Sequence, residues 1–540
     1  MSHPTLEDYL GLVFPWPAGP SIHELIARSS GLMELDLPDH GDAEQRWAPG
    51  ARDAVATSQG EFEDETLRAK QVVKALRDLT ESGSQAHLDH LHRLATRGPV
   101  LGILDQVLGE IVEGPWVNPQ ALHQLAVFLA REATQRELVK LGVGMLGILS
   151  GSDDLDILMT LGRHEEFTLY AVVAIQATRE DSEDHLFALA QTVVGWGRIH
   201  VVERLADSES PRVHAWLLRE GFRSDIMDVY LALLCARVAD LATALQRESS
   251  DRALLEGAAE MLFALCEGSP DEDIDDYEDA AEACLRYVEA LESHPELWST
   301  THLRTLARIA ALLAEGASLD DEVAPIGIEV DADYLWSQRS EQSGWTEERR
   351  EAVEESCARM LAESRWAELV DEGLRAESRD AYLLAVDGAD ALGIDTHESD
   401  KQRLRDDPTW LGGWHRVAEL RSSAPGMLSL FREVVPLEQL GAGPDLRYDF
   451  DEETTLEDAL AVVLEASVDA EERPWDLLEL GLRSPWVRVR ATAINAFDAW
   501  ADSGRIGKSP DEAKAFIEAL VDGEPSDELA EMLRASAAGL

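Results

Sequence analysis

The strongest constraint on the fold is a succession of short amphipathic segments in which apolar residues recur every three or four positions. This spacing places the apolar side chains on one face of an α-helix. Between residues 119 and 267 the segments form pairs that recur roughly every 30 residues, a period typical of repeat proteins whose helix pairs bury their apolar faces against neighbouring pairs. The expected pairs are 119–132 with 134–149, 153–161 with 164–178, 182–194 with 198–206, 211–220 with 223–235, and 237–247 with 250–267.

The pattern is clearest in residues 477–500, which read LLELGLRSPWVRVRATAINAFDAW. Ser484 is expected to cap a helix there and Pro485 to occupy its first turn, a combination typical of helix starts. Apolar residues follow two sides of this helix, which indicates that it is packed between neighbours. We therefore expect four large side chains to be buried, namely Trp486, Ile494, Phe497 and Trp500.

In these features the chain resembles the HEAT and armadillo-like repeat superfamily, most closely over 119–267 and 472–503. The resemblance implies an all-α fold, an α-solenoid of stacked antiparallel helix pairs. A short extended piece is expected only at Ile326 to Val330, in a segment without helical spacing. Such repeats serve as scaffolds, transport receptors, inhibitors and occasional enzymes, so the resemblance concerns the fold more than the function.

Interruptions in the helical spacing suggest how the chain is divided. Helices near 509–522 and 525–538 are expected to cap the end of the array. The expected organisation is an irregular N-terminal cap or tail at 1–63 with a short helix at 22–28, a main array at 64–315, an irregular insertion at 316–345, a second helical block at 346–440, a loop at 441–455, and a C-terminal block with its cap at 456–540.

The charge balance bears on the choice of partner. The chain has 47 Lys and Arg residues against 105 Asp and Glu residues, a formal net charge of −58. Nucleic-acid binding and attachment to anionic lipid both depend on Lys and Arg, so this balance disfavours nucleic acid and membranes. A protein partner that is basic, or that carries a basic patch, is favoured instead. Alternatively, the acidity serves only solubility.

The cysteines and the N-terminus point to a cytoplasmic protein. The four cysteines are widely separated and form no C-x-x-C pair, so neither a disulfide framework nor a zinc site is expected. The first residues lack the basic and apolar regions of a signal peptide, and no stretch approaches 18 apolar residues. No nucleophile elbow, Walker A loop or dinucleotide fingerprint occurs, and no cofactor is expected.

One acidic run matches the ligand spacing of a calcium-binding EF-hand loop. Its departures are Asp276, where the sharp turn requires glycine, and Glu278, where an apolar residue normally lies. The alternative is that the acidic residues form the first turn of a helix running to Leu291, where the helix dipole favours them. The residues at the ligand spacing are Asp271, Asp273, Asp275, Tyr277, Asp279 and Glu282, of which Asp271, Asp273, Asp275 and Glu282 are the candidate metal ligands.

A basic-aromatic segment, residues 196–223, is an exception in this acidic chain. Arg and Trp often anchor protein interfaces because they combine a large area with directional contacts. Alternatively, the arginines pair with acidic side chains of adjacent repeats and Trp216 is part of the core. The candidate partner-binding residues are Trp196, Arg198, His200, Arg204, Arg212, His214, Trp216 and Arg219.

The leading functional hypothesis is a non-enzymatic interaction scaffold or adaptor, including an inhibitor or immunity-type factor, that binds a protein partner on its acidic surface. The hypothesis depends on the fold resemblance. The alternative is an enzyme or ligand-processing protein built on the same scaffold. A concave pocket with several titratable groups of shifted pKa would favour that alternative.

Overall fold

The computed structural model consists of helices, and none of the residues that it describes lies in a strand. It forms two compact units, Met1–Leu369 and Val370–Leu540. The division falls inside the helical block expected at 346–440. The structure describes residues 12, 19–29, 35, 37–39, 48–59, 65–114, 118–149, 154–246, 251–269, 272–314, 344–419, 424–446, 456–469 and 473–540. The proposed extended piece at Ile326 to Val330 lies outside these residues.

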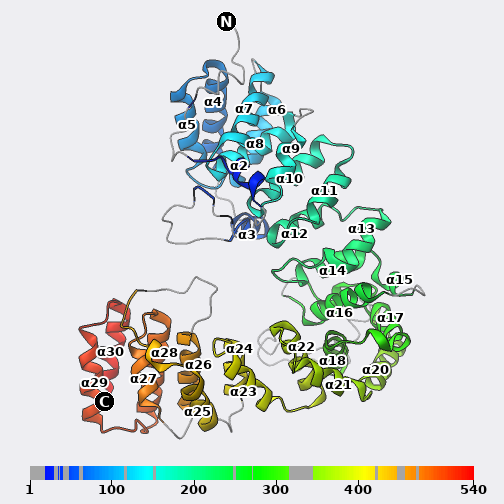
Figure 1. Ribbon diagram of the computed structural model, residues 1–540. Coiled ribbons are helices and arrows are strands. Elements are labelled where there is room, and N and C mark those ends of the chain that lie inside the picture. Colours follow the sequence, from blue (N-terminus) through cyan, green and yellow to red (C-terminus); the bar gives the residue numbers. More distant parts are fainter. Residues whose placement is uncertain are drawn as a thin grey trace, which may run out of the picture. The chain divides into compact units, whose positions relative to one another are not determined.

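In the first unit the helices form pairs, and one helix of each pair packs against the corresponding helix of the next (Figure 1). Contacts run from α4 to α6, α8, α10, α12, α14, α16, α18 and α20 in turn. The helices of this unit are α2 (Ile22–Arg28), α3 (Ala51–Gln59), α4 (Thr66–Ser82), α5 (Gln85–Ala95), α6 (Leu101–Glu113), α7 (Pro119–Glu132), α8 (Arg136–Leu149), α9 (Leu155–Leu161), α10 (Glu165–Thr178), α11 (Ser182–Ala190), α12 (Gly195–Glu203), α13 (Pro211–Trp216), α14 (Val229–Val238), α15 (Leu241–Leu245), α16 (Arg252–Glu267), α17 (Ala280–Ser293), α18 (Thr300–Ala314) and α20 (Glu347–Leu361), with α21 (Arg365–Gly373) at the division.

Local signals explain where several of these helices begin. The Asn118 side chain accepts a hydrogen bond from the N–H of Ala121, and Pro119 opens α7. Asp251 caps α16 in the same way through the N–H of Leu254. Each cap provides an acceptor for an N–H group that has no partner inside the helix. A helix is present near each position expected between 119 and 267, and most ends differ by a few residues. The helix expected at 223–235 needs correction, because α14 begins only at Val229, and the one expected at 237–247 is reduced to α15.

The N-terminal region contains more regular structure than expected. The short helix at 22–28 is confirmed as α2, which packs against α7 and α9. Helix α3 was not expected within the irregular segment. Its sequence, ARDAVATSQ, has few large apolar residues, so the helical spacing is weak. Asp53 and Ala54 of this helix are nevertheless buried. Asp53 contacts Lys140, which is far away in the chain, so the local sequence does not reveal the burial.

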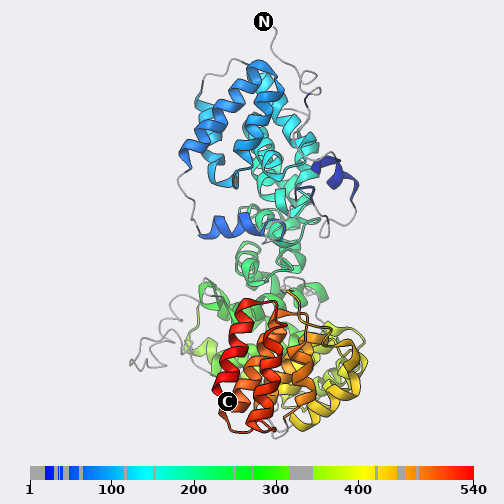
Figure 2. The ribbon, with the colours of Figure 1, turned by 90° about the vertical axis from the view of Figure 1, so that its left-hand side faces the viewer.

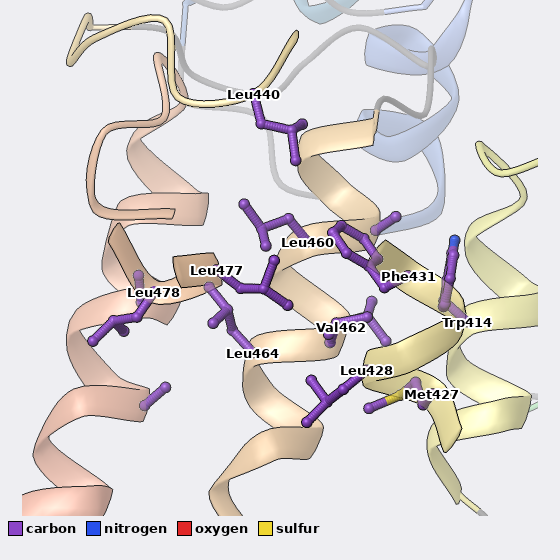
Figure 3. Packing of buried hydrophobic residues seen from close by; sticks show 14 of the residues in the cluster. Trp414, Met427, Leu428, Phe431, Leu440, Leu460, Val462, Leu464, Leu477 and Leu478 are labelled. Atoms are coloured by element: carbon purple, nitrogen blue, oxygen red, sulfur yellow. The ribbon is translucent and has the colours of Figure 1, made fainter. Parts of the chain in front are cut away.

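The second unit has its own apolar core (Figure 3). Contacts connect α24 to α26, α26 to α28 and α28 to α30. Trp414, Phe431 and Leu460 lie in this core, and Figure 3 shows them between neighbouring helices. The helices of this unit are α22 (Arg379–Leu392), α23 (His397–Asp406), α24 (Leu411–Glu419), α25 (Ala424–Val434), α26 (Leu456–Ala466), α27 (Trp475–Leu482), α28 (Val487–Asp502), α29 (Pro510–Val521) and α30 (Asp527–Gly539).

The expected start of α28 needs correction. The helix begins at Val487 with Trp486 as its N-cap, two residues later than the Ser484 cap that the sequence suggested. Ser484 still contributes, because its hydroxyl accepts a hydrogen bond from the N–H of Trp486 at 3.2 Å. Ile494, Phe497 and Trp500 are buried as expected, whereas Trp486 remains partly exposed because it precedes the helix.

The final helix pair is closed by a buried ion pair. Arg490 of α28 donates two hydrogen bonds of 2.8 Å to the carboxylate of Glu524, which precedes α30. The two side chains are only 1% and 3% exposed. Arg490 also donates to the carbonyl oxygen of Ser484 at 2.8 Å. A bidentate guanidinium–carboxylate pair is strongly directional, so it fixes the end of this unit against α28.

Candidate interaction surface

The basic-aromatic segment, residues 196–223, comprises most of α12, all of α13 and the turn that follows it, the part of the first unit coloured in the blue-green to green range in Figure 2. Its most buried arginine acts inside the protein. Arg198 donates hydrogen bonds to the carbonyl oxygens of Val193 at 2.8 Å, Glu220 at 3.1 Å and Arg223 at 3.2 Å. Its guanidinium group also lies over the ring of Trp216, 5.3 Å from the centroid. Arg198 therefore provides hydrogen-bond donors to carbonyl groups in two places, just after α11 and at the end of the turn that follows α13.

Two further arginines pair with acidic residues of adjacent helix pairs. Arg212 approaches Asp184 to 2.8 Å and lies over the ring of Phe187. Arg219 makes two hydrogen bonds to Asp251, of 2.7 and 3.3 Å. These partners are 28 and 32 residues away in the chain. Such contacts are those that the structural alternative predicts, so neither arginine is available without breaking an internal pair.

The remaining cations of the segment differ among themselves. Arg223 makes a bidentate pair with Glu260, at 2.6 and 2.9 Å. His200 is buried, with Nδ1 3.7 Å from the carboxylate of Glu203. Arg204 is half-buried at the end of α12, and its guanidinium group makes no ion pair with any residue that the structure describes. The arginines therefore do not form one accessible ridge of free cations.

The aromatic and imidazole groups of the segment are held by local contacts. His214 is within hydrogen-bonding distance of the carbonyl oxygen of Ser208, at 2.6 Å through Nε2. Trp216 packs edge-on against Phe187, with ring centroids 5.4 Å apart. Trp216 and Trp196 both remain half-buried. Of the two, Trp196 is the tryptophan whose ring lies against an exposed aromatic residue, Tyr230.

An apolar surface adjoins the basic-aromatic segment. The ring of Trp196 lies against that of Tyr230, with centroids 5.8 Å apart. Tyr230 is exposed, and so are Ile226 and Met227 in the loop before α14, Met227 to 47%. Sequence analysis missed these three residues because it placed them inside a helix expected at 223–235, where apolar residues are normally assigned to the core, whereas α14 begins only at Val229. We call Trp196, Ile226, Met227 and Tyr230 the apolar patch.

The backbone that precedes Ile226 in the chain is irregular at two places. Residues Leu217–Gly221 form a π-helical turn instead of continuing α13. Asp225, next to Ile226, has a φ of +65°, which a non-glycine residue rarely adopts. π turns and left-handed non-glycine residues occur preferentially at functional sites because they cost energy that packing must offset. Both irregularities favour a binding role for the loop that carries the patch.

Acidic groups accompany the apolar patch. Glu165 Oε2 accepts a hydrogen bond from the N–H of Trp196 at 3.0 Å. Burial raises the pKa of Glu165 to about 7, and the neighbouring carboxylate of Asp225 adds to the rise. Burial likewise raises the pKa of Asp228, with a further contribution from Glu260. Asp225 itself is exposed. The surface is therefore apolar at its centre with carboxyl groups beside it.

The proposed calcium loop is used for backbone capping. Asp273 Oδ1 accepts the N–H of Asp275 at 2.7 Å, and Asp276 Oδ2 accepts the N–H of Asp273 at 3.0 Å. These contacts form a capping box around a short 3-10 turn, Ile274–Asp276. Asp271 lies outside the described residues. Within the described part of the chain, no three His, Cys, Asp or Glu side chains gather closely enough to hold a metal ion.

The end of the acidic run also differs from an EF-hand. Helix α17 begins at Ala280, so the acidic residues precede it instead of forming its first turn as the alternative supposed. Tyr277 is buried. Glu282 lies on α17 and accepts a hydrogen bond of 2.9 Å from Arg286, one helical turn later. Its carboxylate also lies 3.6 Å from Arg349. Glu282 is therefore engaged with guanidinium groups.

A buried ionic cluster forms a second notable site, which sequence analysis did not find. Lys140 of α8 is 2% exposed, and its Nζ lies 2.7 Å from Asp53, 2.6 Å from Glu166 and 3.4 Å from Glu137. The hydroxyl of Tyr170 donates to Asp53 at 2.8 Å. A signal was available, since Lys140 lies between Val139 and Leu141 in a helix that is apolar on nearly every side. Its closest partners, Asp53 and Glu166, could not be named, because they come from α3 and α10.

The ionic cluster attaches the N-terminal region to the helices. Glu166 also accepts the N–H of Gly50 at 3.1 Å, just before α3. Arg136 donates its backbone N–H to Asp39 at 2.8 Å, and its guanidinium group lies 3.4 Å from Glu166. Burial alone would lower the pKa of Lys140, but Glu137, Glu166 and Asp53 together raise it above its ordinary value. Lys140 is therefore a protonated structural cation at neutral pH.

Other groups that could take part in chemistry are also buried. All four cysteines are free and buried. Burial raises the pKa of Cys266 and of Cys357 to about 12, so both thiols are protonated at neutral pH, and a protonated thiol is a poor nucleophile. Burial lowers the pKa of His302 to about 4, which keeps its imidazole neutral.

Comparison with known proteins provides no relative from which a function could be transferred: no family model, curated protein or solved structure matches the chain. None of the helices in the described ranges has the length and apolar character needed to span a bilayer.

Proposed function

We propose that the protein is a non-enzymatic interaction scaffold of HEAT-like helix pairs, and that it binds a protein partner through the apolar patch. The observation that carries this proposal is the exposure of Ile226, Met227 and Tyr230 together beside Trp196. Contiguous exposed apolar side chains cost solvation free energy unless a partner covers them, and they mark interaction sites. Aromatic residues and methionine are also enriched in interface centres.

The solenoid arrangement is part of the proposal. Its support is the succession of helix contacts from α4 to α20, in which every second helix meets the next of its kind. A stack of this sort exposes the loops and helix ends of successive pairs side by side. The apolar patch lies at such a position, where the start of α12 meets the start of α14.

The partner proposed for the apolar patch is a protein with basic residues around an apolar centre. Asp225 is exposed next to Ile226, while Arg198 and Arg223 nearby are engaged with acceptors of this chain. The chain as a whole carries a net charge of −58. A partner with the opposite charge would be attracted over a distance of about 10 Å at 0.1 M salt.

Affinity purification with the full chain tests the proposal. The double variant Ile226→Lys with Met227→Lys places two cations in the patch and should release the partner. The control is Leu67→Lys, which places a cation at an even more exposed apolar residue on α4, away from the patch. A partner that is retained by the wild type and the control but lost by the double variant supports the patch. If the double variant retains every partner of the wild type, the patch is not the binding surface.

Salt provides a second arm of the same experiment. Raising the salt concentration should weaken the complex, since screening acts on the exposed carboxylate of Asp225 and on the net charge of the chain. Recovery of the same partners at low and high salt would contradict a basic partner. The double variant tests the apolar interface independently of this result.

A further inference from the structure

A groove on the first unit runs between α6 and α10, across the surface of α8. Its volume is about 200 Å³. Leu104 and Leu108 of α6 form one wall, and Leu169 and Val173 of α10 form the other. Val173 is 46% exposed at the mouth of the groove. The side chains that surround the opening are thus mainly apolar.

Two buried glycines of the middle helix contribute to the floor of the groove. Gly144 and Gly147 of α8 line the groove. A Cβ at Gly144 would lie 2.9 Å from a methyl group of Leu104, and a Cβ at Gly147 would lie 3.1 Å from the Cα of Ala174. The two glycines therefore bring α6 and α10 close to α8 and add no side chain of their own to the groove, so that Ile148 is the α8 side chain in its lining.

The charges around the groove have one sign. Helix α6 has no basic residue, and its exposed positions include Asp105, Glu110 and Glu113. Helix α10 also lacks a basic residue. The two basic residues of α8, Arg136 and Lys140, are both engaged in the buried ionic cluster. Among the charged side chains of these three helices, carboxylates are thus the ones left to meet a ligand, and Asp105 lines the groove itself.

The size of the groove decides between a small molecule and a polypeptide. Ligand pockets for whole organic molecules usually measure about 300–1,000 Å³, whereas a cavity of about 150 Å³ holds one benzene ring. A groove of about 200 Å³ thus fits one or two apolar side chains. Helix α6 is about 20 Å long, so a partner helix of a few turns could lie along it and insert such anchors.

We propose that this groove binds an amphipathic helix of a partner protein, with apolar anchors in the groove and Lys or Arg residues facing α6. The site is separate from the apolar patch and does not depend on it. Anchors spaced three or four residues apart would enter between the walls, and cations beside them would meet Asp105 and Glu110.

The test uses a fluorescently labelled 18-residue peptide of leucine and lysine that is apolar on one helical face. A peptide of the same composition in scrambled order controls for charge alone. Fluorescence anisotropy with the full chain measures binding of each. The amphipathic peptide should bind at least about tenfold more tightly than the scrambled one, because only the former presents anchors on one face. Equal binding of the two peptides would overturn the proposal.

Matched variants locate the binding site. Val173→Arg places a bulky cation at the mouth of the groove and should weaken binding at least about tenfold, whereas Gln176→Arg adds the same charge one turn later, outside the lining, and should change binding less than about twofold. Ala177→Arg, at another exposed lining position, serves if Val173→Arg does not fold. Equal effects at Val173 and Gln176 would show that the peptide binds by charge alone and not in the groove.

Discussion

Nζ of Lys140 lies 2.7 Å from Oδ2 of Asp53, although 87 residues separate the two in the chain. The contact connects α8 with α3 and is buried on both sides. Glu137 and Glu166 lie within 3.4 Å of the same ammonium group. One cation thus neutralises part of the charge of three carboxylates in a place that water does not reach.

Replacing Lys140 with methionine should destabilise the first unit by about 3–5 kcal/mol, because it removes the buried ammonium group that three carboxylates share. The shift of the urea unfolding midpoint measures the effect. Lys74→Met is the control, since Lys74 is exposed and pairs with Asp78 on the surface of α4. A surface pair contributes at most about 1 kcal/mol. Equal midpoints for the two variants would contradict a structural role for the cluster.

Removing one partner of the buried pair in the second unit should have a similar cost. Arg490→Leu leaves Glu524 buried without its cation, so we expect a loss of about 3–5 kcal/mol by chemical denaturation. The double variant with Glu524→Leu should recover much of the loss, because no buried charge then remains. Arg483→Leu, which breaks an exposed pair with Glu479, should change little. A double variant less stable than Arg490→Leu would argue against this explanation.

Acid should destabilise the protein in part through His302. Its side chain is buried and shares a 3.0 Å hydrogen bond with Tyr287, and burial lowers its pKa from 6.5 to about 4. As the pH falls below 6.5, His302 becomes protonated in the unfolded chain, whereas in the folded chain it stays neutral until about pH 4. The free energy of unfolding therefore decreases between these two pH values. At pH 5 the loss from this group is about 2 kcal/mol.

The variant His302→Gln isolates this contribution. Although glutamine itself changes the stability at neutral pH, the further loss between pH 7 and pH 5 should be smaller than in the wild type, since glutamine does not titrate in this range. Thermal unfolding at the two pH values measures both. The same pH dependence in the wild type and the variant would show that other groups account for it.

The arginines of the basic-aromatic segment provide a test of their own. Arg212→Ala with Arg219→Ala removes a largely exposed pair with Asp184 and a partly exposed pair with Asp251. Such pairs contribute little, so the melting temperature should fall only slightly, by an amount corresponding to about 1–2 kcal/mol at most. Partner binding through the apolar patch should persist. If the double variant folds normally but no longer binds the partner, these arginines would instead be part of the binding site.

Much of the fold follows from local pattern, whereas the sites do not. Apolar spacing predicts that α7 and α8 exist because a helix buries the residues three and four apart on one face. The same spacing does not reveal that Asp53 meets Lys140, since the contact joins elements that are far apart in sequence. The exposure of Met227 could not be predicted either, because the sequence does not show whether a neighbouring helix covers an apolar residue.

The arginines illustrate the same limit. Arg198 was proposed as a binding residue on composition, but it donates to carbonyl oxygens at 2.8–3.2 Å. Arg68 does the same at the end of α5, with 2.9 Å to the carbonyl oxygen of Ala95. A guanidinium group has five N–H donors in a fixed plane, which suits it to several carbonyl groups at once. Arginine in this chain is therefore as much a cap for helix ends as a surface charge.

The glycines of α8 also affect how the first unit folds. Gly142, Gly144 and Gly147 each cost a helix about 1 kcal/mol relative to alanine, so α8 is a poor helix by itself. A Cβ at Gly142 would lie 2.8 Å from the backbone nitrogen of Ala130 in α7, which places the third glycine against a third neighbour. Helix α8 therefore becomes stable only as α6, α7 and α10 close around it, and these four helices should gain and lose their protection from hydrogen exchange together.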